Sequence, residues 1–127
     1  MAGKIDGANW ALAAAETDSF LSDADSFWVA AYGEPLGDNS CGFGPPGLDN
    51  HLLLNVPTTT GDHALGLSLT ATFVIEHESA ETDNLGATQG RLRIDEITAD
   101  VIRGGAYVRY DDDNLVSGTF AIAICKE

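Results

Sequence analysis

The chain has 127 residues, of which 20 are acidic and 6 basic, and its formal net charge is −14. This imbalance excludes nucleic acid as a partner, because phosphate binding needs a basic footprint, and it disfavours anionic membrane surfaces. The length fits one domain, residues 1–127, with a core of its own. The acidic surface is compatible with cationic partners, with calcium-rich surroundings, or with solubility alone.

The first third of the chain predicts two strands. For residues 1–7 we expect a disordered start, or one added by cloning in place of an export signal. Residues 9–16 (NWALAAAE) alternate like a strand, although the alanine run favours helix; we assign a strand because the segment is short and poorly capped. Residues 17–26 predict a loop or a short helical turn, and residues 27–32 (FWVAAY) a second strand.

The middle of the chain begins with a long loop. Residues 33–50 are rich in glycine and proline, which weaken strands, so we expect a surface excursion tethered at Cys41 and anchored by Phe43. Residues 51–56 predict a short apolar strand that ends at Pro57, before a turn. Residues 65–75 alternate cleanly and predict a long strand that lines the core, whereas the acidic residues 76–86 predict an exposed connection.

The last third predicts three strands. Leu92 and Ile94 alternate with Arg91, Arg93 and Asp95, which indicates a strand with one buried face. Residues 106–110 and 116–125 form a predicted hairpin, closed by the four-residue loop 111–114. The second face of the final strand carries only small side chains, so we expect close packing or a cover there; these side chains are Thr119, Ala121 and Ala123.

Short strands at regular spacing, with turn clusters between them, indicate an all-β fold. We predict a single-domain antiparallel β-sandwich of seven to eight strands, with a small closed β-barrel as the alternative. No apolar run approaches the length of a membrane span, so we expect no membrane insertion.

The two cysteines, Cys41 and Cys125, lack the spacing of a zinc site. We predict a disulfide between them, with two buried free thiols as the alternative. A disulfide implies an oxidising compartment, so we expect a secreted, periplasmic or surface-anchored protein. The bridge would tie the loop 33–50 to the terminal strand.

Two acidic segments are candidate calcium sites, since calcium takes several carboxylate and carbonyl oxygens from a loop. One is the run Asp111, Asp112, Asp113 and Asn114, and the other is the pair Asp23 and Asp25. Neither has the spacing of an EF-hand, and a solvated turn is the alternative for each. Calcium is the one cofactor that the sequence suggests.

Aromatic and histidine side chains are the remaining candidates for function. The aromatic residues Trp10, Trp28, Tyr32 and Phe43 form a platform for a sugar or a protein if they are exposed together, and a core if they are buried. The three histidines have no metal-pair spacing, and we expect His63 and His77 to be exposed.

No catalytic motif is present, which favours a non-catalytic binding or assembly module. Its expected partner is a protein, a glycan or a second copy of the chain, the last through pairing of sheet edges. The alternative is a small barrel around an apolar ligand, with isomerase or hydrolase chemistry at His51, His77 or a buried acid.

Overall fold

The computed structural model describes residues 1–18, 26–37, 40–41, 49–66, 69–79 and 81–125, and it confirms the all-β fold. The described residues form eleven strands, more than the seven to eight expected, because several are only four or five residues long. The strands are β1 (Ala2–Ile5), β2 (Ala8–Ala11), β3 (Ala14–Asp18), β4 (Ser26–Tyr32), β5 (His51–Pro57), β6 (Gly61–Ala64), β7 (Thr70–Glu76), β8 (Thr82–Gly86), β9 (Gln89–Ile97), β10 (Val101–Asp111) and β11 (Asn114–Cys125).

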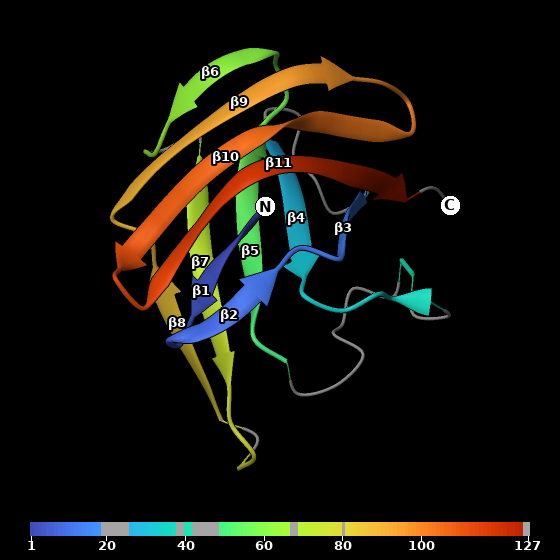
Figure 1. Cartoon of the computed structure of the whole chain (residues 1–127). Helices are drawn as coiled ribbons and strands as arrows, with labels where there is room; N and C mark the ends of the chain where they lie inside the picture. Colours follow the sequence, from blue (N-terminus) through green and yellow to red (C-terminus); the bar gives the residue numbers. More distant parts are fainter. Residues whose placement is uncertain (19–25, 38–39, 42–48, 67–68, 80, 126–127) are drawn as a thin grey trace.

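The strands form one open sheet that curls on itself. Its order is β6-β9-β10-β11-β3-β4-β5-β7-β8, and the β1–β2 hairpin attaches to β11. In Figure 1 the ribbons of β9, β10 and β11 cross over those of β4, β5 and β7, which gives the two facing layers of a sandwich-like fold.

The two layers meet where β11 pairs with β3. This pairing is parallel, with Ala123 opposite Glu16 and Cys125 opposite Asp18, whereas the sequence predicted only antiparallel neighbours. Every other pairing is antiparallel, as expected. The parallel pair brings the end of the chain beside its first third.

The core lies between the layers and is built from the alternating apolar residues of both. Its fully buried members include Val29, Leu52, Val56, Phe73, Leu92, Ile102, Val116 and Ile122. A second, smaller cluster of Ala30, Tyr32 and Leu36 lies on the other face of β4. Strand β4 is therefore buried on both faces along its second half.

The N-terminal region differs from its prediction. Residues 1–7 were expected to be a disordered start or one added by cloning; of these, disorder is wrong for residues 2–5, which form β1 and pair with both β2 and β11. The predicted strand 9–16 is two strands, β2 and β3, because the chain leaves β1 at Leu12 and joins β4 at Ala13. The amide of Leu12 donates to Met1 O, and that of Ala13 donates to Tyr32 O.

The described residues between positions 58 and 86 also differ from their predicted secondary structure. The predicted strand 65–75 overlaps β7, which spans Thr70–Glu76, and Gly66 N donates to Leu69 O just before this strand. The predicted turn before it overlaps β6, and the predicted connection 76–86 contains β8. Strands as short as these contain too few residues to show an alternation.

The predicted C-terminal hairpin is present, but β10 begins at Val101, five residues before the predicted strand 106–110. Asp111 pairs with Asn114, so the loop that closes β10 and β11 has two residues instead of the expected four. The expected cover over Thr119, Ala121 and Ala123 is wrong, since all three are exposed. The described residues form no helix of the length and apolar character needed to cross a membrane.

Candidate functional site

The candidate functional site is the outer face of β9 and β10. The alternation that buries Leu92 and Ile94 turns the residues on either side of them outward. We call this surface the arginine face; it consists of Arg91, Arg93, Arg103 and Arg109. Only 6 of the 127 residues are basic, so one sheet face holds most of the positive charge of an acidic protein.

A groove of about 370 Å³ runs along the arginine face. Arg91 stands directly across from Tyr107 in the register of β9 and β10, and Arg93 stands across from Gly105. Tyr107 is 39% exposed, which makes it one of the two most exposed large apolar side chains among the described residues. The groove is lined by Asp62, Arg91, Leu92, Arg93, Gly105, Ala106, Tyr107, Gly118 and Thr119.

Glycines keep the floor of this groove open. A Cβ atom at Gly105 would stand 3.3 Å from the carbonyl oxygen of Gly118 and 3.4 Å from Nη2 of Arg93. Any side chain at Gly105 would therefore occupy the space beside Arg93. Gly118 has a φ of 128°, which L side chains rarely adopt.

Three of the four arginines are held by carboxylates. Arg93 binds Asp95 through Nε at 2.7 Å and Nη2 at 3.3 Å, and this hydrogen bonding raises the pKa of Arg93. The other two pairs are Arg103–Glu96 at 3.6 Å and Arg109–Asp112 at 2.6 Å. Within the described part of the chain, Arg91 forms no ion pair, so its guanidinium is available to a carboxylate in the groove.

The acidic turn at residues 111–114 uses its side chains locally. Asp111 Oδ1 accepts hydrogen bonds from Asp113 N and from Asn114 Nδ2, both at 3.0 Å. Asp112 pairs with Arg109, and Asn114 Oδ1 accepts from Asp6 N at 2.9 Å. The structure thus assigns each of these three side chains a role in the turn, and calcium binding there stays a prediction.

The other calcium candidates, Asp23 and Asp25, lie outside the described residues, and so does Phe43. Among the described residues, one group of three potential ligand atoms from acidic, histidine or cysteine side chains lies within 4.8 Å of one another. This group is Glu16, Cys41 and Cys125, and the Asp111 turn takes no part in it.

Of the two interpretations of the aromatic residues, exposed platform or buried core, the core holds for two of them. Trp10 is 8% exposed and donates from Nε1 to Asn50 O at 3.1 Å, whereas Tyr32 is 3% exposed in the cluster outside β4. Both rings therefore belong to the packed interior. Trp28 is half-buried and packs against the same outer cluster as Tyr32.

The histidines lie away from the space between the layers. His77 is exposed, as expected, and its Nε2 lies 2.9 Å from Asp83 Oδ2, a hydrogen bond that raises the pKa of His77. His51 is buried beside Tyr32, with ring centroids 5.6 Å apart, on the outer side of β4 and β5. The apolar-ligand alternative requires a polar group inside the core, and neither of these two histidine rings supplies one.

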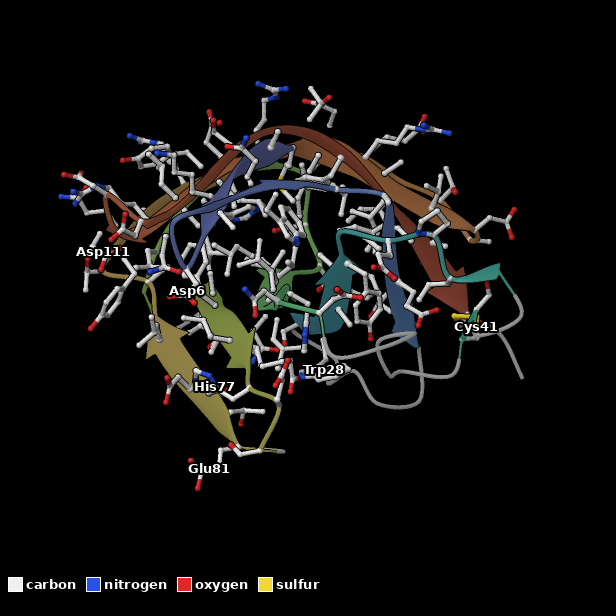
Figure 2. All side chains as sticks on the ribbon, turned by 60° about the horizontal axis from the view of Figure 1, so that its bottom comes forward. Asp6, Trp28, Cys41, His77, Glu81 and Asp111 are labelled. Atoms are coloured by element: carbon white, nitrogen blue, oxygen red, sulfur yellow. A yellow bond between two sulfur atoms is a disulfide. The ribbon has the colours of Figure 1, made fainter. Side chains whose placement is uncertain are left out.

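The predicted disulfide is confirmed. Cys41 and Cys125 are bonded, with their Cα atoms 5.8 Å apart across a sequence separation of 84. The bond ties the end of β11 to the segment after β4, and Figure 2 places Cys41 at the opposite end of the molecule from Asp111.

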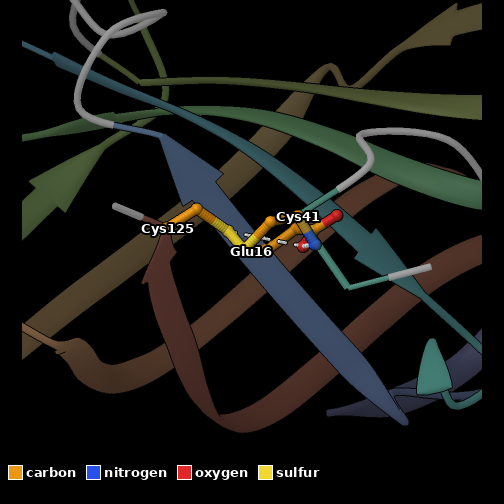
Figure 3. Close-up of side chains that lie close together, drawn as sticks. All are labelled: Glu16, Cys41 and Cys125. Atoms are coloured by element: carbon orange, nitrogen blue, oxygen red, sulfur yellow. Dashed lines mark hydrogen bonds between the residues drawn. A yellow bond between two sulfur atoms is a disulfide. The ribbon is translucent and has the colours of Figure 1, made fainter. Parts of the chain in front are cut away.

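A buried carboxylate touches this disulfide. Glu16 of β3 is 2% exposed, and its Oε2 accepts a 2.5 Å hydrogen bond from Cys41 N. The same oxygen lies 3.6 Å from Cys125 Sγ (Figure 3). The negative charge of Glu16 also contributes, after burial, to raising the pKa of Tyr32 to about 12.

Two of these features were missed by the sequence analysis. The arginine face was detectable, because all four arginines fall within residues 91–109 at even spacings, and three of them, Arg91, Arg93 and Arg109, lie on predicted strands. Glu16 gives no local signal, since its burial depends on partners far along the chain. Comparison of the chain with protein-family models, with curated proteins and with solved structures found no match.

Proposed function

We propose that the protein is a non-catalytic, extracytoplasmic binding module in which the groove on the arginine face holds an anionic glycan. The observation that carries this proposal is the unpaired guanidinium of Arg91 beside the exposed ring of Tyr107. Guanidinium binds carboxylate through two parallel hydrogen bonds, and a sugar ring stacks on an aromatic face.

The rest of the groove suits a glycan as well. Thr119 and Asp62 line it and offer a hydroxyl and a carboxylate, which can pair with sugar hydroxyls. Because Gly105 and Gly118 have no side chains, a sugar ring can approach the backbone at the floor of the groove. The volume of about 370 Å³ lies at the lower end of the range of small-molecule sites, which fits one or two sugar units at a time.

The disulfide supports the proposed compartment. A bond between Cys41 and Cys125 is compatible with an oxidising environment, and it supports the proposal that the module works outside the cytoplasm. Acidic glycans of cell surfaces and matrices are ligands that such a compartment offers.

Self-association is the second candidate, because the sheet has open edges at β6 and β8 and a basic face that complements its acidic remainder. These edges are only 4 and 5 residues long, which leaves little backbone for a second chain to pair with. Sedimentation at several protein and calcium concentrations tests this candidate, and a monomer throughout excludes it.

The glycan proposal is tested by calorimetric titration with an oligogalacturonate and with the same oligosaccharide carrying methyl-esterified carboxyls. We expect binding of the acidic form only, weakened by salt because the contact is ionic. Arg91→Ala and Tyr107→Ala should each weaken binding about tenfold or more.

Arg103→Ala is the matched control. It removes the same charge from the same face, but Arg103 pairs with Glu96 and does not line the groove. The proposal fails if Arg103→Ala weakens binding as much as Arg91→Ala, or if the esterified oligosaccharide binds as well as the acidic one.

A further inference from the structure

The two sulfurs of the disulfide lie in different surroundings. Cys41 is exposed at the surface, whereas Cys125 is 4% exposed at the end of β11. We propose that Cys41–Cys125 is a reversible thiol–disulfide exchange centre, with Cys41 as the attacked sulfur and Cys125 as the leaving sulfur. A purely structural crosslink does not require this asymmetry, but an exchange centre does, because only an accessible sulfur meets an incoming thiolate.

In the reduced state, Glu16 can accept a hydrogen bond from the Cys125 thiol, and the disulfide has no such hydrogen bond. In the disulfide, Cys125 Sγ lies 3.6 Å from Glu16 Oε2 and has no proton to donate. After reduction, the Cys125 thiol has a buried carboxylate oxygen within reach of a sulfur hydrogen bond. Hydrogen bonds to charged acceptors are the stronger ones, so Glu16 favours the dithiol state.

The backbone conformation of Cys41 also favours the dithiol state. Cys41 has a φ of 63°, in the left-handed region that costs energy for residues other than glycine. The bond to Cys125 and the hydrogen bond from Cys41 N to Glu16 together hold this conformation. Reduction removes one of these two restraints.

A groove of about 400 Å³ gives access to the site, and both Glu16 and Cys41 line it. Its other walls include Leu36, Ser40, Asp100 and Val101. This groove lies apart from the groove on the arginine face, with no lining residue in common. A small thiol of the glutathione class therefore has a route to Cys41 that a ligand on the arginine face leaves open.

The reaction balances with two equivalents of such a thiol. A thiolate attacks Cys41 Sγ, the bond to Cys125 breaks, and Cys125 leaves with the electron pair and takes up a proton from water. A second thiolate attacks the outer sulfur of the mixed disulfide, and Cys41 leaves as thiolate and is protonated in turn. The protein disulfide is reduced to two thiols, and two small thiols are oxidised to one disulfide.

The test measures which cysteine carries glutathione. Cys125→Ser protein and Cys41→Ser protein are incubated with oxidised glutathione under native conditions, trapped in acid and analysed by peptide mass spectrometry. We expect a mixed disulfide at Cys41 in the first variant and at least tenfold slower modification of Cys125 in the second. Near-ultraviolet circular dichroism of both proteins verifies that the fold is retained.

Glu16 variants test the role of the carboxylate. In redox equilibrium with glutathione, Glu16→Leu in the chain with both cysteines should shift the disulfide-to-dithiol ratio about tenfold toward the disulfide relative to wild type, because the dithiol loses a charged acceptor. Glu16→Gln keeps an oxygen for Cys41 N and should shift it less. If Glu16→Leu does not fold, the comparison of Glu16→Gln with wild type over a pH series carries this test.

Two results overturn the proposal. One is equal modification of Cys41 and Cys125 in the folded serine variants. The other is a wild-type disulfide that glutathione reduces only when the protein unfolds, which identifies the bond as an inert crosslink.

Discussion

The backbone amide of Asp6 donates a 2.9 Å hydrogen bond to Oδ1 of Asn114, which joins two turns that lie 108 residues apart in the chain. Gly7 N donates to Asp113 O beside it at 3.0 Å. Asp6 and Gly7 have φ values of 53° and 73°, the left-handed geometry of a tight two-residue hairpin turn. Figure 2 shows Asp6 and Asp111 at the same corner of the molecule. The N-terminal hairpin is therefore docked through Asn114.

Replacing Asn114 with alanine should destabilise the protein by about 1–3 kcal/mol, because the side chain is 3% exposed and its loss leaves the Asp6 amide without an acceptor. Urea unfolding measures this change. Asn55→Ala, at an exposed position of β5, is the control and should change the midpoint little. A loss for Asn114→Ala no larger than that of Asn55→Ala contradicts the docking role.

Gly104 lies in β10 at a point where its backbone closely approaches the paired strand β9. A Cβ atom at Gly104 would lie 1.9 Å from the carbonyl oxygen of Arg93, at a register shift between these strands. We expect Gly104→Ala to cost about 1–3 kcal/mol or more by forcing the strands apart. Gly86→Ala, where no atom lies within 4 Å, should be nearly neutral in the same thermal melts. Equal melting temperatures for the two variants would show that the strands yield freely.

The sequence predicts β9, β11 and the second half of β10 because these segments alternate and have one buried face. Strands β1, β6 and β8 escape prediction because each has four or five residues, among them glycine and charged residues, and exists through its pairing with a longer strand. Local pattern cannot reveal a strand that a distant neighbour induces.

The candidate sites likewise divide into features that a local sequence pattern predicts and features that depend on distant parts of the chain. The outward positions of Arg91 and Arg93 follow from alternation alone, and two cysteines leave only one possible intramolecular pairing if they are bonded. The position of Glu16 beside both sulfurs depends on the parallel pairing of β3 with β11, which no local feature predicts. The burial of Trp10 and Tyr32 likewise depends on their packing partners.

Tyr32 should make the stability of the protein fall at high pH. Burial, and then the charge of Glu16, raise the pKa of Tyr32 from 10.0 to about 12. Between these values the unfolded chain loses the phenol proton while the folded protein keeps it, so stability is lost as pH rises through this window. The shift corresponds to about 3 kcal/mol at most. Tyr32→Phe should flatten urea midpoints measured from pH 9 to 12, and an unchanged slope contradicts the burial of this phenol.

The disulfide should contribute less than its loop length implies. A loop closed across 84 residues stabilises by roughly 4–5 kcal/mol in the chain-entropy model. The left-handed backbone of Cys41 opposes this gain by about 1 kcal/mol, and the hydrogen bond that Glu16 offers a free thiol opposes it further. We expect reduction in urea series to cost about 2–3 kcal/mol. A loss equal to the full chain-entropy figure would contradict this account.

The central claim is that the arginine face binds an anionic glycan, and amide chemical-shift mapping during titration with oligogalacturonate tests it most directly. We expect the perturbed amides to cluster on the groove, at Arg91, Arg93, Gly105, Tyr107 and Thr119, and to return to their free positions when salt is added. Perturbations centred elsewhere on the surface, or none at millimolar oligosaccharide, would contradict the claim.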